Sequence, residues 1–311
     1  VDFDPGPGTA NLIALGSQDI FFAKYDSQGN YLWAKNLGGT GGGQGHGLAT
    51  DDSGNVYITG RFIGTLDFDP NIGTVNLGSA GFDIFIAEYD SNGNYIWAIG
   101  MGDSGNGYSE DIALDAAGNV YITGEFDNTI DFDPDTGVAN LASNGQGDIF
   151  FAKYDTDGNY LWAHSIWGIN HEFGNSIATN ASGEVLITGV FQSSVDFDPG
   201  VGTAFLPYQG FFDIYFAKYD TDGNYLWAAS IAIIAGEVEG LCIASDLAGN
   251  IYLSGRFTGT ADFDPGLGTT NLTSVGVGDI FIAKYSPTAT NLFENNFASN
   301  ISVYPNPTKS N

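Results

Sequence analysis

The chain has 311 residues and a formal net charge of −29, because 37 acidic residues outnumber 8 lysines and arginines. Nucleic acids and anionic membrane surfaces are held by clustered cations, so this balance excludes both classes of partner, and no apolar run approaches the roughly 18 residues of a membrane span. Hydrophobic residues make up 43% of the chain and 45 residues are glycine, which predicts a sizeable core built from many short elements and turns, without membrane insertion.

Two kinds of strand pair are predicted in the first repeat, taken in chain order. Strands at residues 20–25 and 31–36 are joined by a short turn whose glycine supplies the positive φ that a hairpin loop needs. Strands at residues 48–50 and 55–62 follow, the second with alternating β-branched and aromatic residues, and a tight turn joins this pair as well. No stretch has a helical period, so we expect an all-β protein.

The whole pattern returns about every 65 residues. The tetrapeptide Asp-Phe-Asp-Pro starts at Asp2, Asp67, Asp131, Asp196 and Asp262. A tryptophan holds one register of the last strand in four copies, at Trp33, Trp97, Trp162 and Trp227. Four antiparallel strands per period are typical of a propeller blade. We therefore predict a β-propeller of four-stranded antiparallel blades, with four full repeats plus a partial one.

The register of small residues favours the propeller over its alternative, a β-solenoid. Alanine recurs on the first strand of each period, at Ala49, Ala113, Ala178 and Ala244. Small residues suit an innermost strand, where blades crowd around an axis, whereas solenoid coils are usually shorter and lack two hairpin turns per repeat. The first strand of each period is therefore predicted to lie innermost.

Three repeated segments and the tail resemble known families. Gly-Asn-Val-Tyr-Ile-Thr-Gly, Asp-Ile-Phe-Phe-Ala-Lys-Tyr-Asp and Gly-Asn-Tyr-Leu-Trp-Ala resemble the bacterial β-propeller repeat family called SBBP, found in large exported proteins, over residues 1–287. Residues 300–308, Asn-Ile-Ser-Val-Tyr-Pro-Asn-Pro-Thr, resemble the opening of the C-terminal sorting domain of type IX secretion. These resemblances imply a secreted protein or one on the outer cell surface, with the type IX secretion machinery as a partner.

The same resemblances divide the chain. We expect propeller repeats at residues 1–287, a linker at 288–299 and the truncated beginning of a sorting domain at 300–311. Because residue 1 falls inside a repeat, we also expect the chain to be a fragment of a longer array or a chain processed at its N-terminus.

The Asp-Phe-Asp-Pro segments are the candidate metal sites. Two carboxylates stand two residues apart in an extended segment, so both face one side, just before a Pro-led turn whose carbonyls add oxygen ligands. This pattern predicts calcium as a cofactor, with the ligands Asp2, Asp4, Asp67, Asp69, Asp131, Asp133, Asp196, Asp198, Asp262 and Asp264. The alternative is that these carboxylates cap backbone amides of the turn.

Signatures of catalysis are largely missing, so we predict that the chain is not an enzyme. A sialidase, the obvious propeller hydrolase, needs three arginines on the substrate carboxylate, and the chain has only Arg61 and Arg256. The three histidines stand in no recognisable nucleophilic motif. Cys242 falls on a predicted innermost strand and is expected to be a small buried residue rather than a nucleophile.

Loops that differ between the repeats mark the candidate ligand site. In an up-and-down four-stranded blade, the connections after the second and fourth strands leave from one edge, so the variable loops and the Asp-Phe-Asp-Pro loops should share one loop-rich face. The residues there that break the repeat are Tyr108, Glu110, Trp167, His171, Glu172, Phe173, Glu237 and Glu239. Trp167 is either an exposed platform for a ligand or a plug for the gap opened by its own irregular loop.

The predicted function is a non-catalytic binding or adhesion module, secreted or on the cell surface, with an extracellular glycan or protein ligand and loops stabilised by calcium. One alternative is a carbohydrate-active hydrolase whose catalytic carboxylates lie among Glu110, Glu172, Glu237 and Glu239. The other is a purely architectural spacer in a large surface protein.

Overall fold

The computed structural model describes residues 1–209, 211–266, 268–286 and 302–305, and the regular secondary structure among them is entirely β-strand. Within this described part, a two-stranded half-blade precedes four antiparallel four-stranded units, which we call blades 1 to 4. The half-blade consists of β1 (Ile20–Tyr25) and β2 (Tyr31–Gly39). Blade 1 consists of β3 (Gly42–Thr50), β4 (Val56–Asp67), β5 (Asn76–Tyr89) and β6 (Tyr95–Asp103).

The next three blades repeat this order of strands. Blade 2 consists of β7 (Gly107–Leu114), β8 (Val120–Phe126), β11 (Asp148–Tyr154) and β12 (Tyr160–Ile166). Blade 3 consists of β13 (Glu172–Thr179), β14 (Val185–Phe191), β15 (Asp213–Tyr219) and β16 (Tyr225–Ala235). Blade 4 consists of β17 (Val238–Ser245), β18 (Ile251–Phe257), β21 (Asp279–Tyr285) and β22 (Ser302–Pro305). Two short hairpins, β9 (Thr129–Asp131) with β10 (Asn140–Ala142) and β19 (Thr260–Asp262) with β20 (Asn271–Thr273), complete the set.

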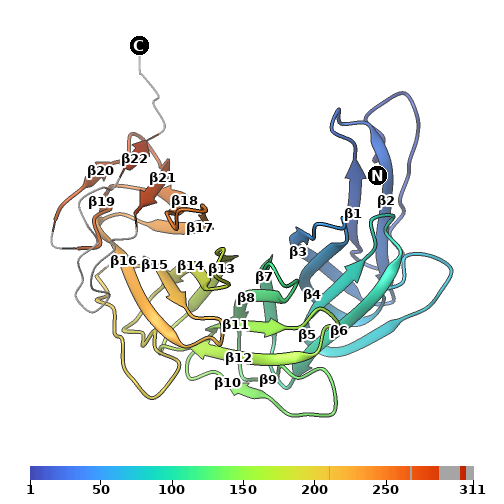
Figure 1. Ribbon diagram of the computed structural model, residues 1–311, viewed down its shortest axis with the longest axis horizontal. Coiled ribbons are helices and arrows are strands. Elements are labelled where there is room, and N and C mark those ends of the chain that lie inside the picture. Colours follow the sequence, from blue (N-terminus) through green and yellow to red (C-terminus); the bar gives the residue numbers. More distant parts are fainter. Residues whose placement is uncertain (210, 267, 287–301, 306–311) are drawn as a thin grey trace.

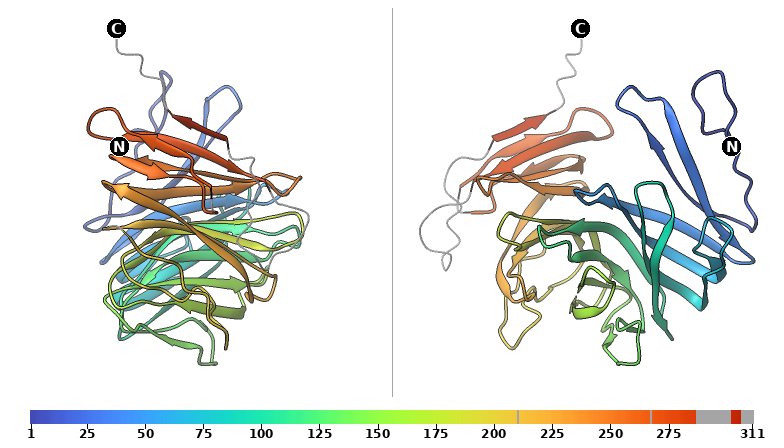
Figure 2. Two further views of the ribbon diagram at one scale, coloured as in Figure 1. Left: turned by 90° about the vertical axis from the view of Figure 1, so that its left-hand side faces the viewer. Right: turned by 45° about the vertical axis from the view of Figure 1, so that its right-hand side comes forward.

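The blades follow one another along an open arc (Figure 1). The first strands β3, β7, β13 and β17 line its inner side and contact one another in turn, which confirms the predicted innermost position. The half-blade and blade 4 stand on opposite sides of the opening (Figure 2), and no sheet of the described residues closes on itself. In the described residues, no helix is long and apolar enough to cross a membrane.

The hydrophobic core lies between successive blades. Side chains alternate between the two faces of a strand, so neighbouring residues of one strand belong to different junctions. Phe150 packs with Ile86 at the junction of blades 1 and 2, whereas Phe151 packs with Tyr219 at the junction of blades 2 and 3. Each of the four junctions has its own cluster of buried residues, so each blade is stabilised mainly by its neighbours.

The predicted strands are confirmed, and several are longer than expected. The strand predicted at residues 20–25 is β1, whereas the one predicted at 48–50 is only the end of β3, which begins at Gly42. Glycines at residues 42, 43 and 45 weaken the sequence signal of this segment. The ladder to β4 nevertheless orders it, with Gly42 opposite Ile63.

The Asp-Phe-Asp-Pro segments form strand ends and small hairpins rather than simple loops. Asp131 of β9 pairs with Gly102 of β6, and Asp262 of β19 pairs with Ala232 of β16. From the second copy of the motif onward, its Asp residue thus pairs with the outer strand of the preceding unit. The phenylalanines of four of these motifs, Phe68, Phe132, Phe197 and Phe263, are fully buried.

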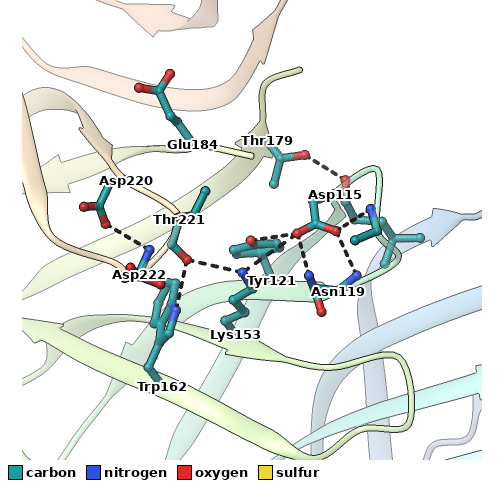
Figure 3. A network of polar contacts seen from close by, with 12 residues as sticks. Asp115, Asn119, Tyr121, Lys153, Trp162, Thr179, Glu184, Asp220, Thr221 and Asp222 are labelled. Atoms are coloured by element: carbon teal, nitrogen blue, oxygen red, sulfur yellow. Dashed lines mark hydrogen bonds and ion pairs between the residues drawn. The ribbon is translucent and has the colours of Figure 1, made fainter. Parts of the chain in front are cut away.

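Polar contacts join neighbouring blades at the opposite end, where the tight turns lie. The indole N–H of Trp162 in blade 2 donates to the carbonyl of Thr221 in blade 3 at 3.3 Å, and the ammonium of Lys153 donates to the same oxygen at 3.2 Å (Figure 3). The indole of Trp97 reaches Thr156 in the same way one repeat earlier. Trp97 and Trp162 therefore link neighbouring blades through backbone carbonyls as well as through packing.

Two expectations about the C-terminal third have different outcomes. The predicted linker, 288–299, lies outside the described residues, and so does most of the predicted sorting segment, 300–311. The described part of that segment, Ser302–Pro305, is β22, which pairs antiparallel with β21 as the fourth strand of blade 4. The expectation that Cys242 is buried is wrong, since its side chain is exposed. The equivalent Ser176 is covered by β17, whose Ile243 N–H donates to the serine hydroxyl, whereas no described residue covers β17 in that way.

Candidate functional site

Both irregular connections of each blade lie at one end, as predicted. The Asp-Phe-Asp-Pro hairpins pair with the last residues of the outer strands, from which the variable connections leave. The tight turns lie at the other end, for example at Gly158, whose φ of 82° is the left-handed conformation that glycine adopts readily. The loop-rich face is therefore confirmed as a structural feature.

The paired aspartates hold the hairpins through backbone hydrogen bonds. Oδ1 of Asp131 accepts the backbone N–H groups of Asp133 at 3.1 Å and Ala139 at 2.8 Å, and Oδ1 of Asp133 accepts that of Asp135 at 3.0 Å. Equivalent pairs of bonds form at Asp2, Asp67, Asp196 and Asp262. The backbone N–H donors of Ala10 and Asp4 lower the pKa of Asp2. The capping role is thus confirmed for all five copies.

Metal binding by the ten aspartates stays a prediction. Among the described residues, no group of three or more histidine, cysteine, aspartate or glutamate side chains is placed to hold a metal ion. Calcium would therefore have to take part of its oxygen ligands from backbone carbonyls and water, beside one or two carboxylates.

At the junction of blades 1 and 2, an arginine fills the space between two rings. The guanidinium of Arg61 lies 4.9 Å from the ring centre of Phe82 and 4.6 Å from that of Tyr108. Partial burial raises the pKa of Tyr108, although the charge of Arg61 opposes the shift. Close by, the predicted residue Glu110 lies 3.1 Å from Nδ1 of His46. Tyr108 and Glu110 thus both belong to contacts within the protein.

At the junction of blades 2 and 3, two acids are buried near each other. Glu172 and Asp148 are fully buried. Oε1 of Glu172 accepts the hydroxyl of Ser193 at 2.7 Å, whereas Oε2 has no hydrogen-bond partner among the described residues. Burial, together with the charge of Asp148, raises the pKa of Glu172 to about 7, and burial raises that of Asp148 to about 6. This pair is enclosed, so it is poorly placed to touch a ligand.

Two other predicted residues lie close to this acid pair. His171 stacks on Phe173 with ring centres 5.8 Å apart, and Nδ1 of His171 is buried without a partner among the described residues. Trp167 forms a backbone bridge with Asp196, at the end of the outer strand of blade 2, and its side chain is 45% exposed. In the other copies this bridge position holds glycine or alanine. Trp167 therefore stands out from the surface, which leaves its platform role a prediction.

The junction of blades 3 and 4 opens into a cavity of about 620 Å³ on the loop-rich face. It brings together three of the predicted residues, Phe173, Glu237 and Glu239. Its other lining residues are Asn175, Val190, Phe211, Phe212, Val238, Arg256, Phe257, Thr258, Val277, Gly278, Asp279 and Ile280. A largely apolar cavity with a few charged groups at its rim is the usual form of a ligand site.

Aromatic rings form one wall of this cavity and charged groups another. The rings of Phe173 and Phe212 lie 6.1 Å apart, and Phe212 and Phe211 lie 5.1 Å apart. Phe211 is 63% exposed, so the wall continues to the surface. On the other side, Nε of Arg256 donates to Oε2 of Glu239 at 2.6 Å.

Several residues of the sites were not singled out from the sequence. Phe211, Phe212 and Arg256 line the cavity, and Asp148 completes the buried pair. A usable signal existed for Phe212, because the residue before the repeated aspartate is glycine in two other copies, Gly147 and Gly278. No such signal marks Asp148, since it belongs to the repeat.

Known proteins share the repeat pattern of this chain. Residues 32–61 match the SBBP family, described as a β-propeller repeat. The chain is 30% identical over 320 residues to the uncharacterized WD repeat-containing protein L264 of Acanthamoeba polyphaga mimivirus. The aligned region covers 85% of this chain and 23% of that protein. It is also 29% identical over 145 residues to the regulatory protein FlaEY of Caulobacter vibrioides. This aligned region covers 46% of this chain and 15% of that protein. The chain thus spans less than a quarter of the length of either relative.

Among solved structures, the Pan2 WD40 domain of Neurospora crassa resembles 77% of this chain over 83% of its own length, at 12% identity and a TM-score of 0.21. The SBBP match at residues 32–61 and the repeated four-stranded antiparallel sheets are both features of β-propeller repeat proteins.

Proposed function

We propose that the chain is a non-catalytic binding module of a protein that is secreted or displayed on the outer cell surface, and that its ligand site is the cavity between blades 3 and 4. The cavity carries this proposal, because it combines aromatic walls, charged groups at the rim and an open mouth on the loop-rich face. The resemblance of residues 300–308 to a type IX sorting domain supports the location outside the cell. The proposed ligand is an extracellular protein or glycan.

The distribution of the singular glutamates favours binding over hydrolysis. Glycoside hydrolysis needs two carboxyl groups on opposite sides of one scissile bond. Glu110, Glu172 and the pair Glu237 and Glu239 lie at three different blade junctions, and Glu172 is fully buried. A carbohydrate-active hydrolase would have to use Glu237 and Glu239 alone, of which Glu239 is paired with Arg256.

Replacing Phe211 by alanine is expected to weaken ligand binding at least tenfold without lowering the melting temperature. Phe211 is 63% exposed, so its removal costs little packing, but it forms the outer part of the cavity wall. Ligands would be sought on glycan and protein arrays with the full chain, alongside a hydrolysis screen, and affinities measured by calorimetry. Ile72→Ala, at a fully exposed position of another hairpin, is the matched control and should bind normally.

The outcomes separate the candidate functions. Binding that depends on Phe211 supports the cavity, whereas binding that depends on Trp167 and not on Phe211 would move the site to the junction of blades 2 and 3. Turnover of a glycan would replace the proposal by the hydrolase. No binding and no turnover would leave an architectural spacer.

Calcium is expected to raise the melting temperature if the Asp-Phe-Asp-Pro hairpins bind it, because a ligand that prefers the folded state stabilises that state by mass action. Melting would be compared in chelator, in calcium and in sodium at matched ionic strength. Sodium controls for simple screening of the net charge of −29. Equal midpoints in calcium and sodium would reduce the ten aspartates to their capping role.

A further inference from the structure

Strand pairing places Arg61 and Val190 at the same position of blades 1 and 3. Arg61 of β4 pairs with Ile84 of β5, and Val190 of β14 pairs with Ile214 of β15. Each isoleucine directly follows the repeated aspartate at the start of the third strand. The surroundings of these two positions can therefore be compared directly.

In blade 1 this position shows which group fits the space between two blades. The guanidinium of Arg61 lies over the rings of Phe82, in its own blade, and Tyr108, in the next one. Such a planar cation is attracted to the faces of aromatic rings. The junction of blades 1 and 2 therefore contains a binding position for a guanidinium, which Arg61 occupies. We call this position the guanidinium seat.

The junction of blades 3 and 4 keeps one part of this arrangement, the phenylalanine, and has an open space where the guanidinium would lie. Phe173 takes the place of Gln44, whose Oε1 accepts hydrogen bonds from Nε and Nη2 of Arg61 in blade 1. Phe212 corresponds to Phe82, since each precedes the repeated aspartate, and Glu239 corresponds to Tyr108 by strand pairing. Val190 ends at its γ-methyl groups, so no side chain extends from it as Arg61 does in blade 1. Val190, Phe212 and Glu239 all line the cavity of about 620 Å³.

The charges around the cavity favour a cation. Three carboxylates line it, those of Glu237, Glu239 and Asp279, against one cation, Arg256. Arg256 bonds to Oε2 of Glu239, and a carboxylate can accept further hydrogen bonds at its second oxygen. The net charge of −29 also attracts cationic partners over longer distances.

We propose that the cavity between blades 3 and 4 binds an arginine side chain of a partner protein, with its guanidinium between Phe212 and the carboxylate of Glu239. This inference rests on the proposed binding function and names the chemistry of its ligand. A guanidinium in this seat replaces the stack on Tyr108 by an ion pair, while it keeps the stack on the phenylalanine.

The test uses the peptide acetyl-Gly-Gly-Arg-Gly-Gly-amide and its lysine and citrulline counterparts, titrated into the full chain at low salt by calorimetry. The arginine peptide should bind at least tenfold more tightly than the citrulline peptide, which has the shape without the charge. It should also bind more tightly than the lysine peptide, which has the charge without the planar group. Equal binding of the arginine and citrulline peptides, or no binding of the arginine peptide at millimolar concentration, would overturn the proposal.

Two variants locate the seat. Val190→Arg should fill the cavity in the manner of Arg61 and weaken binding of the arginine peptide at least tenfold. Val138→Arg adds the same charge at an exposed hairpin position of blade 2 and should bind within twofold of the unmodified chain. If Val190→Arg does not fold, Glu237→Gln serves instead, because Glu237 is exposed and its loss should weaken binding at least threefold.

Wild-type affinity in a folded Val190→Arg variant would contradict the seat, as would wild-type affinity in Glu237→Gln. A glycan or protein that binds through Phe211 while the arginine peptide does not bind would overturn this inference and leave the proposed function standing. Failure of every ligand class would count against the proposed function itself.

Discussion

Replacing Phe132 by alanine is expected to lower the free energy of unfolding by about 3–5 kcal/mol, the usual cost of removing a fully buried aromatic ring. Phe132 is the phenylalanine of one Asp-Phe-Asp-Pro motif and is fully buried. Its ring lies 5.0 Å from that of Phe150 and 5.9 Å from that of Phe126. It therefore fixes the hairpin, and through it the outer strand of blade 1, to the core of the junction.

The chain offers a matched control for this variant. Phe3 is the same residue of the motif in the first copy, but it is only half-buried. Its ring lies 4.9 Å from that of Phe21, which is itself 61% exposed. Phe3→Ala should therefore cost clearly less than Phe132→Ala in denaturant unfolding followed by tryptophan fluorescence. Equal losses for the two variants would mean that the motif is not anchored by burial of its ring.

The strand order and the inner position of the first strands follow from the sequence because the period is almost free of insertions. Each alternation of β-branched or aromatic residues recurs at the same distance from a turn. A strand that is hard to predict in one repeat can therefore be assigned from the equivalent residues of the other repeats. The role of the Asp-Phe-Asp-Pro hairpins does not follow in the same way. From the second copy onward, each motif pairs with the preceding unit, as Asp131 does with Gly102, so the contact joins residues of different repeats. A pattern of neighbouring residues in the sequence does not predict such a contact.

The candidate site was only partly predictable for a related reason. Comparing the repeats marks residues that differ, and three of these, Phe173, Glu237 and Glu239, line the cavity. The same comparison also marks Glu110 and Glu172, which are engaged in contacts within the protein. Whether a singular residue faces a cavity depends on the size of its neighbours across the junction, such as Val190, and this is a property of packing rather than of pattern.

Replacing Glu172 by glutamine is expected to stabilise the protein above neutral pH and to change little at pH 5. A glutamate side chain outside the fold has a pKa of about 4.5. In the folded chain, burial and the nearby Asp148 raise the pKa of Glu172 to about 7. Between these two values the folded state binds more protons than the unfolded state, so stability falls as the pH rises through this window. Glutamine stays neutral, so the variant does not lose this free energy of unfolding. The loss amounts to roughly 3 kcal/mol for a difference of about 2.5 between the two pKa values.

The size of the effect should therefore grow with pH, and melting temperatures at intervals between pH 5 and pH 8 would measure it. Glu184→Gln is a control of opposite sign. Partial burial alone would raise the pKa of Glu184, but hydrogen bonds from Lys218 and Asn180 outweigh it and lower the pKa. The ionised form of Glu184 thus stabilises the fold above the unfolded pKa, and its replacement should lower the melting temperature at pH 8. Parallel melting curves for Glu172→Gln and the unmodified chain across this range would show that Glu172 is already ionised without cost, and hence that water or a cation reaches the acid pair at the junction of blades 2 and 3.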